Sequence, residues 1–247
     1  MPYPEENHTS SPQREFATTQ WSIVLRVGQA TQEESHDALA TLCKGYWYPL
    51  YAYVRRRVND RAEAQDLTQE FFARLLEKDL LASASPDRGR FRSFLLTAMK
   101  NFLANEWHKA HAEKRGGTRA ILSLDFGSGD SRLTLEPGHD LTPERLYERK
   151  WALTLLDRVL HRLRDEYQAH KKAALFEALR PFIGGGREEG AYFMVAVELG
   201  LTTGAAKVAA HRLRNRYREL LRDELAQTVA DLAEIDAEIA WLFRALG

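Results

Sequence analysis

Apolar side chains recur every three or four residues from about residue 37 onward, which is the period of an amphipathic helix. Three such stretches precede residue 114, and they are separated by breaks at 59–60 and 83–90. Their inward-facing residues are Leu39, Leu42, Tyr46, Leu50, Tyr53 and Val54, then Leu67, Phe71 and Leu75, then Phe91, Phe94, Leu95, Ala98, Phe102 and Leu103. No stretch alternates apolar and polar residues for long enough to build a sheet, so we expect an all-α fold.

Turn-forming residues divide the chain into segments. A polar start without periodicity predicts a loose tail, and the glycine-rich stretch that ends near Pro137-Gly138 predicts a linker. Helices resume where Thr142 can cap and Pro143 can occupy the first helical position. The predicted segments are a tail with one short helix over 1–36, a first helical domain over 37–114, a linker over 115–144, a second helical domain over 145–223 and a C-terminal helical extension over 224–247.

Residues 189–220 have the pattern of a helix-turn-helix. The first helix is predicted to end at Leu199, Gly200 to adopt the unusual backbone of a tight turn, and Thr202 to cap the second helix. The inward face of the second helix consists of Ala206, Ala209 or Ala210, Leu213, Tyr217 and Leu220. The candidate DNA-binding residues on it are Thr203, Lys207, His211, Arg212, Arg214 and Arg218. Such a row can contact phosphates and guanine in the major groove, and a solvated basic face on an ordinary helix is the plainer alternative.

The last segment carries a second apolar stripe. Its members, spaced by three or four residues, are Leu225, Val229, Leu232, Ile235, Ile239, Leu242 and Leu246. A stripe of this kind must be buried against something. We expect it to pack onto the second domain, because tertiary packing is what stabilises such helices. An inhibitory contact with the first domain and a docking face for a regulator remain as alternatives.

Charge and composition narrow the function. The chain has 35 basic and 35 acidic residues, so net charge alone speaks against a protein coated in nucleic acid. The basic residues are nevertheless clustered, as in a local phosphate-binding surface. Six Lys or Arg and one acid lie from Lys207 to Arg222, and a second basic group runs from Lys109 to Arg119. Cys43 is the only cysteine, which excludes a disulfide or a cysteine-based zinc site within one chain. Without a signal peptide or an apolar run of about 18 residues, we expect a cytoplasmic protein that has no membrane partner.

Two stretches of the first domain resemble one protein family. AEAQDLTQEFFARLLEK resembles the second conserved region of extracytoplasmic-function sigma factors, a group of the sigma-70 family, and FRSFLLTAMKNFLANEWHKAHAEKRGG resembles their promoter-melting region. The helix-turn-helix resembles their fourth region, although Ala206 stands where the family usually has a larger aliphatic residue. The resemblance covers residues 37–114 and 145–223. It implies a non-enzymatic sigma factor that binds core RNA polymerase, recognises promoter DNA and promotes its melting.

The resemblance also implies roles for single residues. Asp66, Gln69 and Glu70 match positions that dock on the clamp helices of the polymerase's large subunit. The polar residues available to capture the unpaired minus-ten strand are Arg90, Arg92, Lys100, Asn101, Asn105, His108 and Lys109. Strand capture needs cations for the backbone and aromatic surfaces for the bases. Trp107 is either such a stacking platform or a packing residue of the helix.

Other chemistries are weaker interpretations. Asp66 and Glu70 share a helix face and could bind a metal or act as an acid and base, but no histidine converges on them. His108 and His111 have no third ligand near them in the sequence. The glycines at 184–186 lack the Lys-Ser/Thr pair of a phosphate loop. We therefore expect no catalytic site, no metal and no cofactor.

Two rival functions stay open at this stage. One is a stand-alone helix-turn-helix regulator that binds duplex DNA without polymerase, and the other is a metal-dependent hydrolase. Neither accounts for both resembling regions at once. Regulation by an anti-sigma protein, by the C-terminal helix or by abundance alone is compatible with the sequence.

Overall fold

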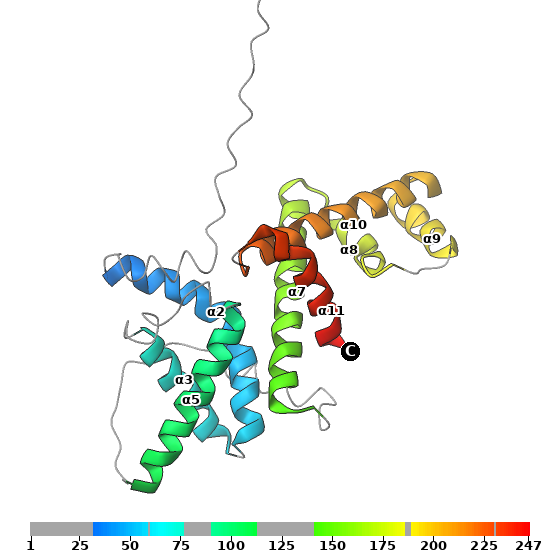
Figure 1. Cartoon of the computed structure of the whole chain (residues 1–247). Coiled ribbons are helices and arrows are strands. Elements are labelled where there is room, and N and C mark those ends of the chain that lie inside the picture. Colours follow the sequence, from blue (N-terminus) through cyan, green and yellow to red (C-terminus); the bar gives the residue numbers. More distant parts are fainter. Residues whose placement is uncertain (1–31, 59, 77–89, 113–140, 186–188, 230) are drawn as a thin grey trace, which may run out of the picture.

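The computed structural model describes residues 32–58, 60–76, 90–112, 141–185, 189–229 and 231–247, and within these ranges it contains helices and turns but no strand. The all-α prediction is confirmed. The predicted tail with its short helix, and most of the predicted linker, lie outside the described residues. Figure 1 shows two groups of helices, with the long helix α7 (Pro143–Ala169) between them.

The first group consists of α2 (Gln32–Arg57), α3 (Arg61–Leu76) and α5 (Phe91–Ala112). Aromatic rings join these helices into one core: the ring centroid of Phe102 lies 5.7 Å from that of Phe71, and the centroid of Phe91 lies 5.4 Å from that of Tyr46. The predicted break at 59–60 is confirmed, and α5 begins at the predicted residue. α2 begins at Gln32, five residues before the predicted start at 37, because its polar first turn has no apolar period to reveal it.

α7 is the central helix of the molecule. The two predicted features of its start are confirmed: Thr142 Oγ1 accepts a hydrogen bond from the Arg145 amide at 3.3 Å, and Pro143 is the first helical residue. At 1.5 Å per residue its 27 residues span about 40 Å. It packs against α2 on one side and against α10 (Thr203–Ala226) and α11 (Ile235–Leu246) on others.

This placement of α7 joins the two predicted domains. By the sequence α7 belongs to the second domain, yet its most extensive packing is against α2 of the first. Leu146 and Lys150 of α7 are buried, and so are its core residues Tyr147, Trp151, Ala152, Leu155, Val159 and Leu163. Together with buried residues of α2, α3, α5 and α10, these core residues form one contiguous hydrophobic core. The two sets of helices are therefore held together in this conformation rather than connected only by a linker.

The second group extends from α7 as an arm. It contains α8 (Ala173–Leu179), the 3-10 turn η2 (Arg180–Phe182), α9 (Glu189–Leu199) and α10. α9 ends at Leu199 and Gly200 has φ of +63°, as the turn pattern predicted. Thr202 Oγ1 accepts from the Ala205 amide at 3.1 Å and starts α10. The two helices bend by 99° across this turn, within the range of helix-turn-helix units.

The C-terminal extension folds back along α7. α10 continues to Ala226, and after the 3-10 turn η3 (Leu232–Glu234) α11 packs against α7 and α10. The predicted packing onto the second domain is confirmed. Leu232 departs from the predicted stripe because the chain leaves the helix there, and its side chain is exposed.

Candidate nucleic-acid interface

Arg90 and Arg92 stand at the start of α5, and both meet the C-terminal helix. Arg90 Nε lies 2.8 Å from Glu238 Oε2, and Arg92 Nη1 pairs with Glu238 Oε1. Glu238 belongs to α11, and its side chain is 0 % exposed. A buried carboxylate is tolerated only where cations or donors replace its lost water. We call these three residues the arginine clamp.

Two tryptophans enclose the guanidinium of Arg92. Its Cζ lies 3.5 Å from the ring centroid of Trp241 on α11 and 5.0 Å from that of Trp151 on α7. The two indoles meet edge to face, with centroids 5.5 Å apart. The phenol of Tyr147 on α7 donates to the Arg92 carbonyl oxygen at 2.9 Å. Arg92 is thus held by α7 and α11 together, and contacts of its cation with indole faces are worth about 0.5–2 kcal/mol each.

Burial changes the properties of Arg92. The residue is 4 % exposed, and desolvation, followed by the neighbouring charge of Arg90, lowers its pKa to about 10. The guanidinium therefore stays protonated at neutral pH. The sequence predicted that Arg90 and Arg92 touch promoter DNA, but α11 covers Arg92 and pairs with Arg90 in this conformation.

None of the described hydrogen bonds or ion pairs joins the other predicted residues of α5 to α11. Lys100, Asn101, Asn105 and His108 are exposed, and the side chain of Lys109 lies outside the described residues. Lys100 Nζ lies 3.0 Å from Glu144 Oε1 in the first turn of α7. The hydrogen bond from Lys100 holds the pKa of Glu144 below its usual value. Trp107 is 38 % exposed, so part of its ring is accessible to a base.

The three predicted polymerase contacts share one stretch of α3. Asp66 is exposed, while Gln69 and Glu70 are half-buried. Glu70 Oε1 accepts from Arg74 Nε at 2.9 Å, and Arg74 Nη2 reaches Glu106 of α5 at 2.8 Å. Glu70 therefore contributes to the contact between α3 and α5, and Asp66 is the more accessible of the two acids.

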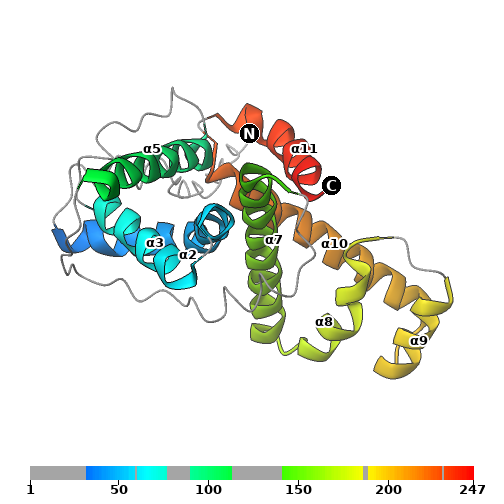
Figure 2. The same cartoon turned by 90° about the horizontal axis from the view of Figure 1, so that it is seen from below.

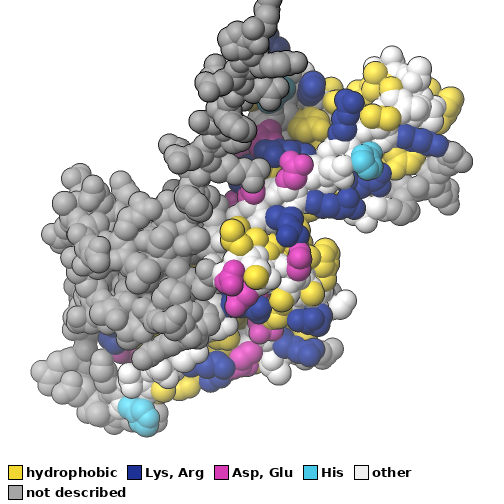
Figure 3. Space-filling view, turned by 45° about the horizontal axis from the view of Figure 1, so that its top comes forward, with side chains coloured by type: hydrophobic (Ala, Val, Ile, Leu, Met, Phe, Trp, Pro, Cys, Tyr) yellow, Lys and Arg dark blue, Asp and Glu magenta, His cyan; other side chains and the backbone are white. Residues whose placement is uncertain are grey.

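The predicted basic row lies along α10. Lys207, His211, Arg212 and Arg218 are exposed, and Thr203 and Arg214 are half-buried. Arg218 Nη1 donates to Asn215 Oδ1 at 3.2 Å, which orients it along the helix. Arg216 lies beside the row, and two 2.8 Å hydrogen bonds to the Glu166 carboxylate direct it to α7 instead. In Figure 3 dark blue side chains follow the arm that carries α10, on both sides of a histidine.

The structure does not bring the α5 and α10 residues together. α7 lies between these two helices, and Figure 2 shows α5 and the arm on opposite sides of it. One continuous strand-binding surface is therefore absent from the part of the chain that the structure describes. The candidate residues of α5 and of α10 therefore form two separate surfaces.

Sequence reasoning missed the partners of the arginines. Glu238, Trp241, Trp151 and Glu144 were not predicted as site residues, although all four face predicted ones. One signal for Glu238 was present. It follows Ile235 by three residues and precedes Leu242 by four, so the apolar stripe itself places a carboxylate on its buried side.

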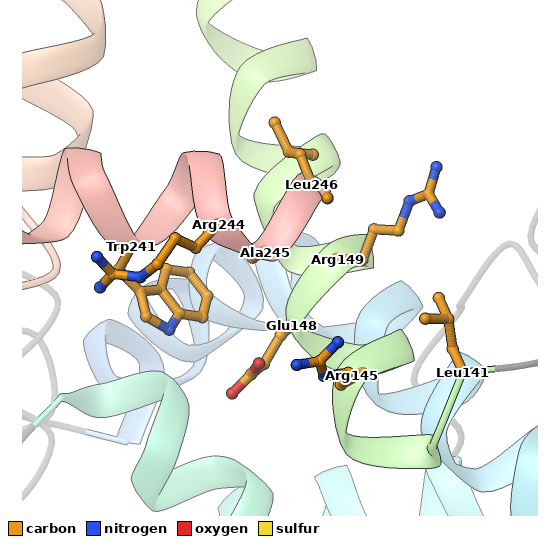
Figure 4. Close-up of a pocket in the computed structure, with 9 residues that line it drawn as sticks. Leu141, Arg145, Glu148, Arg149, Trp241, Arg244, Ala245 and Leu246 are labelled. Atoms are coloured by element: carbon orange, nitrogen blue, oxygen red, sulfur yellow. The ribbon is translucent and has the colours of Figure 1, made fainter.

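A pocket of about 280 Å³ lies between the start of α7 and the end of α11. Arg145, Arg149 and Arg244 line it, which would suggest an anion site. Figure 4 shows that their guanidinium groups do not converge. Arg244 lies along Trp241, Arg145 lies beside Glu148, and Arg149 points away from both of the other arginines. The pocket offers no single point at which an anion would meet three cations.

The described residues show neither a metal site nor a single membrane-spanning helix. No group of three His, Cys, Asp or Glu side chains there could hold a metal ion. None of the helices described is by itself long and apolar enough to cross a membrane, and one bent pair, Gly190–Leu199 with Thr203–Ala226, meets that test by length and composition alone.

Comparison with known proteins identifies one domain. Residues 46–113 match the family model of Sigma-70 region 2, which covers α2 from Tyr46 onward together with all of α3 and α5. No curated protein and no solved structure matches the chain.

Proposed function

We propose that this protein, which carries a Sigma-70 region 2 domain, is a sigma factor of the extracytoplasmic-function group that brings core RNA polymerase to promoter DNA and promotes its melting. The match of residues 46–113 carries the proposal, because that domain has a role in polymerase binding and promoter melting in sigma-70 factors. The protein performs no bond chemistry in this account. Its partners are core polymerase and promoter DNA.

Within region 2, α3 is the polymerase side and α5 the strand side. Asp66 presents its carboxylate to solvent on α3, as docking on a basic surface of the polymerase requires. Lys100, Asn101, Asn105 and His108 offer cations and amides along α5, and Trp107 offers part of an aromatic face. These groups fit capture of an unpaired strand.

The α9–α10 unit is the proposed reader of the minus-thirty-five element. Its turn geometry and the exposed Lys207, His211 and Arg218 on α10 support this assignment. Because α7 separates α5 from α10, the two promoter elements are contacted by separate surfaces. This fits two elements that lie apart along a promoter.

Binding to core polymerase tests the proposed docking residue. Asp66→Asn removes one exposed charge without touching the Glu70–Arg74 pair, and we expect core affinity to fall about five- to tenfold. The measurement is anisotropy of the labelled full-length protein titrated with core enzyme. Glu177→Gln is the matched control, because Glu177 is an exposed acid on α8 at the far side of α7. The core affinity of this variant should equal that of the wild type.

Equal core affinity of all three proteins would show that Asp66 is not part of the polymerase interface. A protein that never binds core yet binds duplex DNA would be a stand-alone regulator.

A further inference from the structure

We propose that α11 is a built-in occupant of the strand-binding site of region 2: the Glu238 carboxylate takes the place of a DNA phosphate at Arg90 and Arg92, and the Trp241 ring takes the place of a base on the Arg92 guanidinium. The free protein is therefore closed, and α11 must leave before promoter DNA can reach these arginines. This inference rests on the proposed function.

The chemistry of the arginine clamp is that of a nucleotide contact. A carboxylate and a phosphate both accept from guanidinium groups in the same way, and Glu238 meets two of them. The indole of Trp241 lies 3.5 Å from Arg92 Cζ, the stacking that an arginine offers to a base. One helix thus supplies an acceptor and an aromatic face to one arginine pair.

The partners of Arg92 divide into permanent and removable ones. Tyr147 and Trp151 belong to α7, which is part of the core shared with α2. Glu238 and Trp241 belong to α11, a helix of 12 residues at the end of the chain. If α11 departs, Arg92 keeps its carbonyl contact and one indole, and its guanidinium opens on the side that α11 has left. The site is then formed and needs no refolding.

α11 can depart without disrupting the rest of the molecule. It follows a break in the helix between Ala226 and Ile235, so its release leaves α10 intact. An isolated helix of this length is marginal in water, and packing on α7 is what holds it. Glu238 is the buried acid that pairs with both clamp arginines, so this pairing contributes to docking beside the exposed Arg222–Asp236 pair between α10 and α11.

The test is binding of a short fluorescein-labelled single-stranded DNA of mixed sequence to the full-length protein, followed by anisotropy at low salt. Glu238→Gln keeps the shape and removes the charge. We expect it to raise DNA affinity about tenfold, because affinity rises with the fraction of molecules in the open state. Glu234→Gln is the control, because Glu234 is an exposed acid just before α11 and its substitution removes the same charge. The DNA affinity of this variant should match that of the wild type. Equal gains from both variants would mean simple charge repulsion and overturn the proposal.

A second substitution ties the gain to the clamp. In an Arg92→Ala background, Glu238→Gln should raise DNA affinity much less than tenfold, because only Arg90 of the two clamp arginines remains to be exposed. A tenfold gain that persists in this background would contradict the assigned contact. If neither wild type nor Glu238→Gln binds the DNA, the proposal also fails, since an open site must bind.

Amide hydrogen exchange of the wild type supplies a test that depends on no variant. Saturating single-stranded DNA should speed exchange of residues 235–246 and leave α7 protected. Unchanged exchange of α11 in the DNA complex would show a permanent brace and reject the inference. This test can fail separately from the proposed function. If the protein supports initiation with core enzyme but exchange of α11 does not change, only the proposal that α11 occupies the strand site is rejected. If DNA displaces α11 but no initiation occurs, only the sigma-factor role is rejected.

Discussion

The guanidinium of Arg92 has two kinds of partner, a carboxylate from Glu238 and the indole faces of Trp151 and Trp241, while the like charge of Arg90 opposes its ionisation. Removing one member of a buried pair costs about 3–5 kcal/mol when the other stays buried. In this protein the cost can be avoided, because departure of α11 returns Arg92 to water. The Arg92–Glu238 pair therefore links the position of α11 to the exposure of one arginine.

A second ion pair has a simpler role and gives a prediction in pH. Two hydrogen bonds from Arg216 hold the pKa of Glu166 below its usual value. A lowered folded-state pKa stabilises the fold above the unfolded carboxyl pKa, and that stabilisation is lost as pH falls through the folded value. Because both side chains are partly exposed, we expect Glu166→Gln to lower the unfolding free energy by only about 0.5 kcal/mol at pH near 7. Urea unfolding of wild type and Glu166→Gln is measured at neutral pH and again at a pH well below the usual glutamate pKa. The difference between their unfolding free energies should shrink toward zero at the acid pH. A difference that is constant with pH would contradict the pairing.

At the scale of elements, local signals predicted the helices well. Thr142, Pro143, Gly200 and Thr202 are short-range signals, and each marks the boundary at which it was expected. The extension was less accessible to this reasoning. Its stripe predicted a buried helix, but nothing local reveals the break at 227–234 or which of several apolar surfaces the helix would choose.

The cap of α10 gives a prediction at this scale. Thr202→Ala removes the acceptor of the Ala205 amide and should lower the unfolding free energy by about 1 kcal/mol. Thr97→Ala, at an exposed position of α5, is the matched control, because it removes a mid-helix hydroxyl that donates to the Ser93 carbonyl. Alanine favours helices, so the unfolding free energy of this variant should stay unchanged or rise slightly. Denaturant unfolding of the three proteins measures both. Equal losses would show that the hydroxyl at 202 is not acting as a cap.

At the scale of the whole molecule, α7 decides the arrangement. The sequence predicted two domains and a linker, because glycine-rich residues separate two helical stretches. The structure packs α7 on α2 and buries Trp151, Leu155 and Val159 in a core common to both. Amphipathic spacing predicts that these residues are buried, but it does not predict against which helix they pack. Contacts between distant helices, such as that of Arg92 with Glu238, therefore could not be predicted from local patterns. The site residues of α3, α5 and α10 stay predictions from the sequence, and the residues that cover two of them were not predicted.

The proposed function is that this protein directs core RNA polymerase to start transcription. The most direct test is run-off transcription with purified core polymerase on fragments of the source genome, with and without the full-length protein. We expect discrete transcripts that need the protein, that weaken with Asp66→Asn and that persist with Glu177→Gln. Core enzyme that binds the protein or the DNA but yields no start site dependent on it would contradict the proposal.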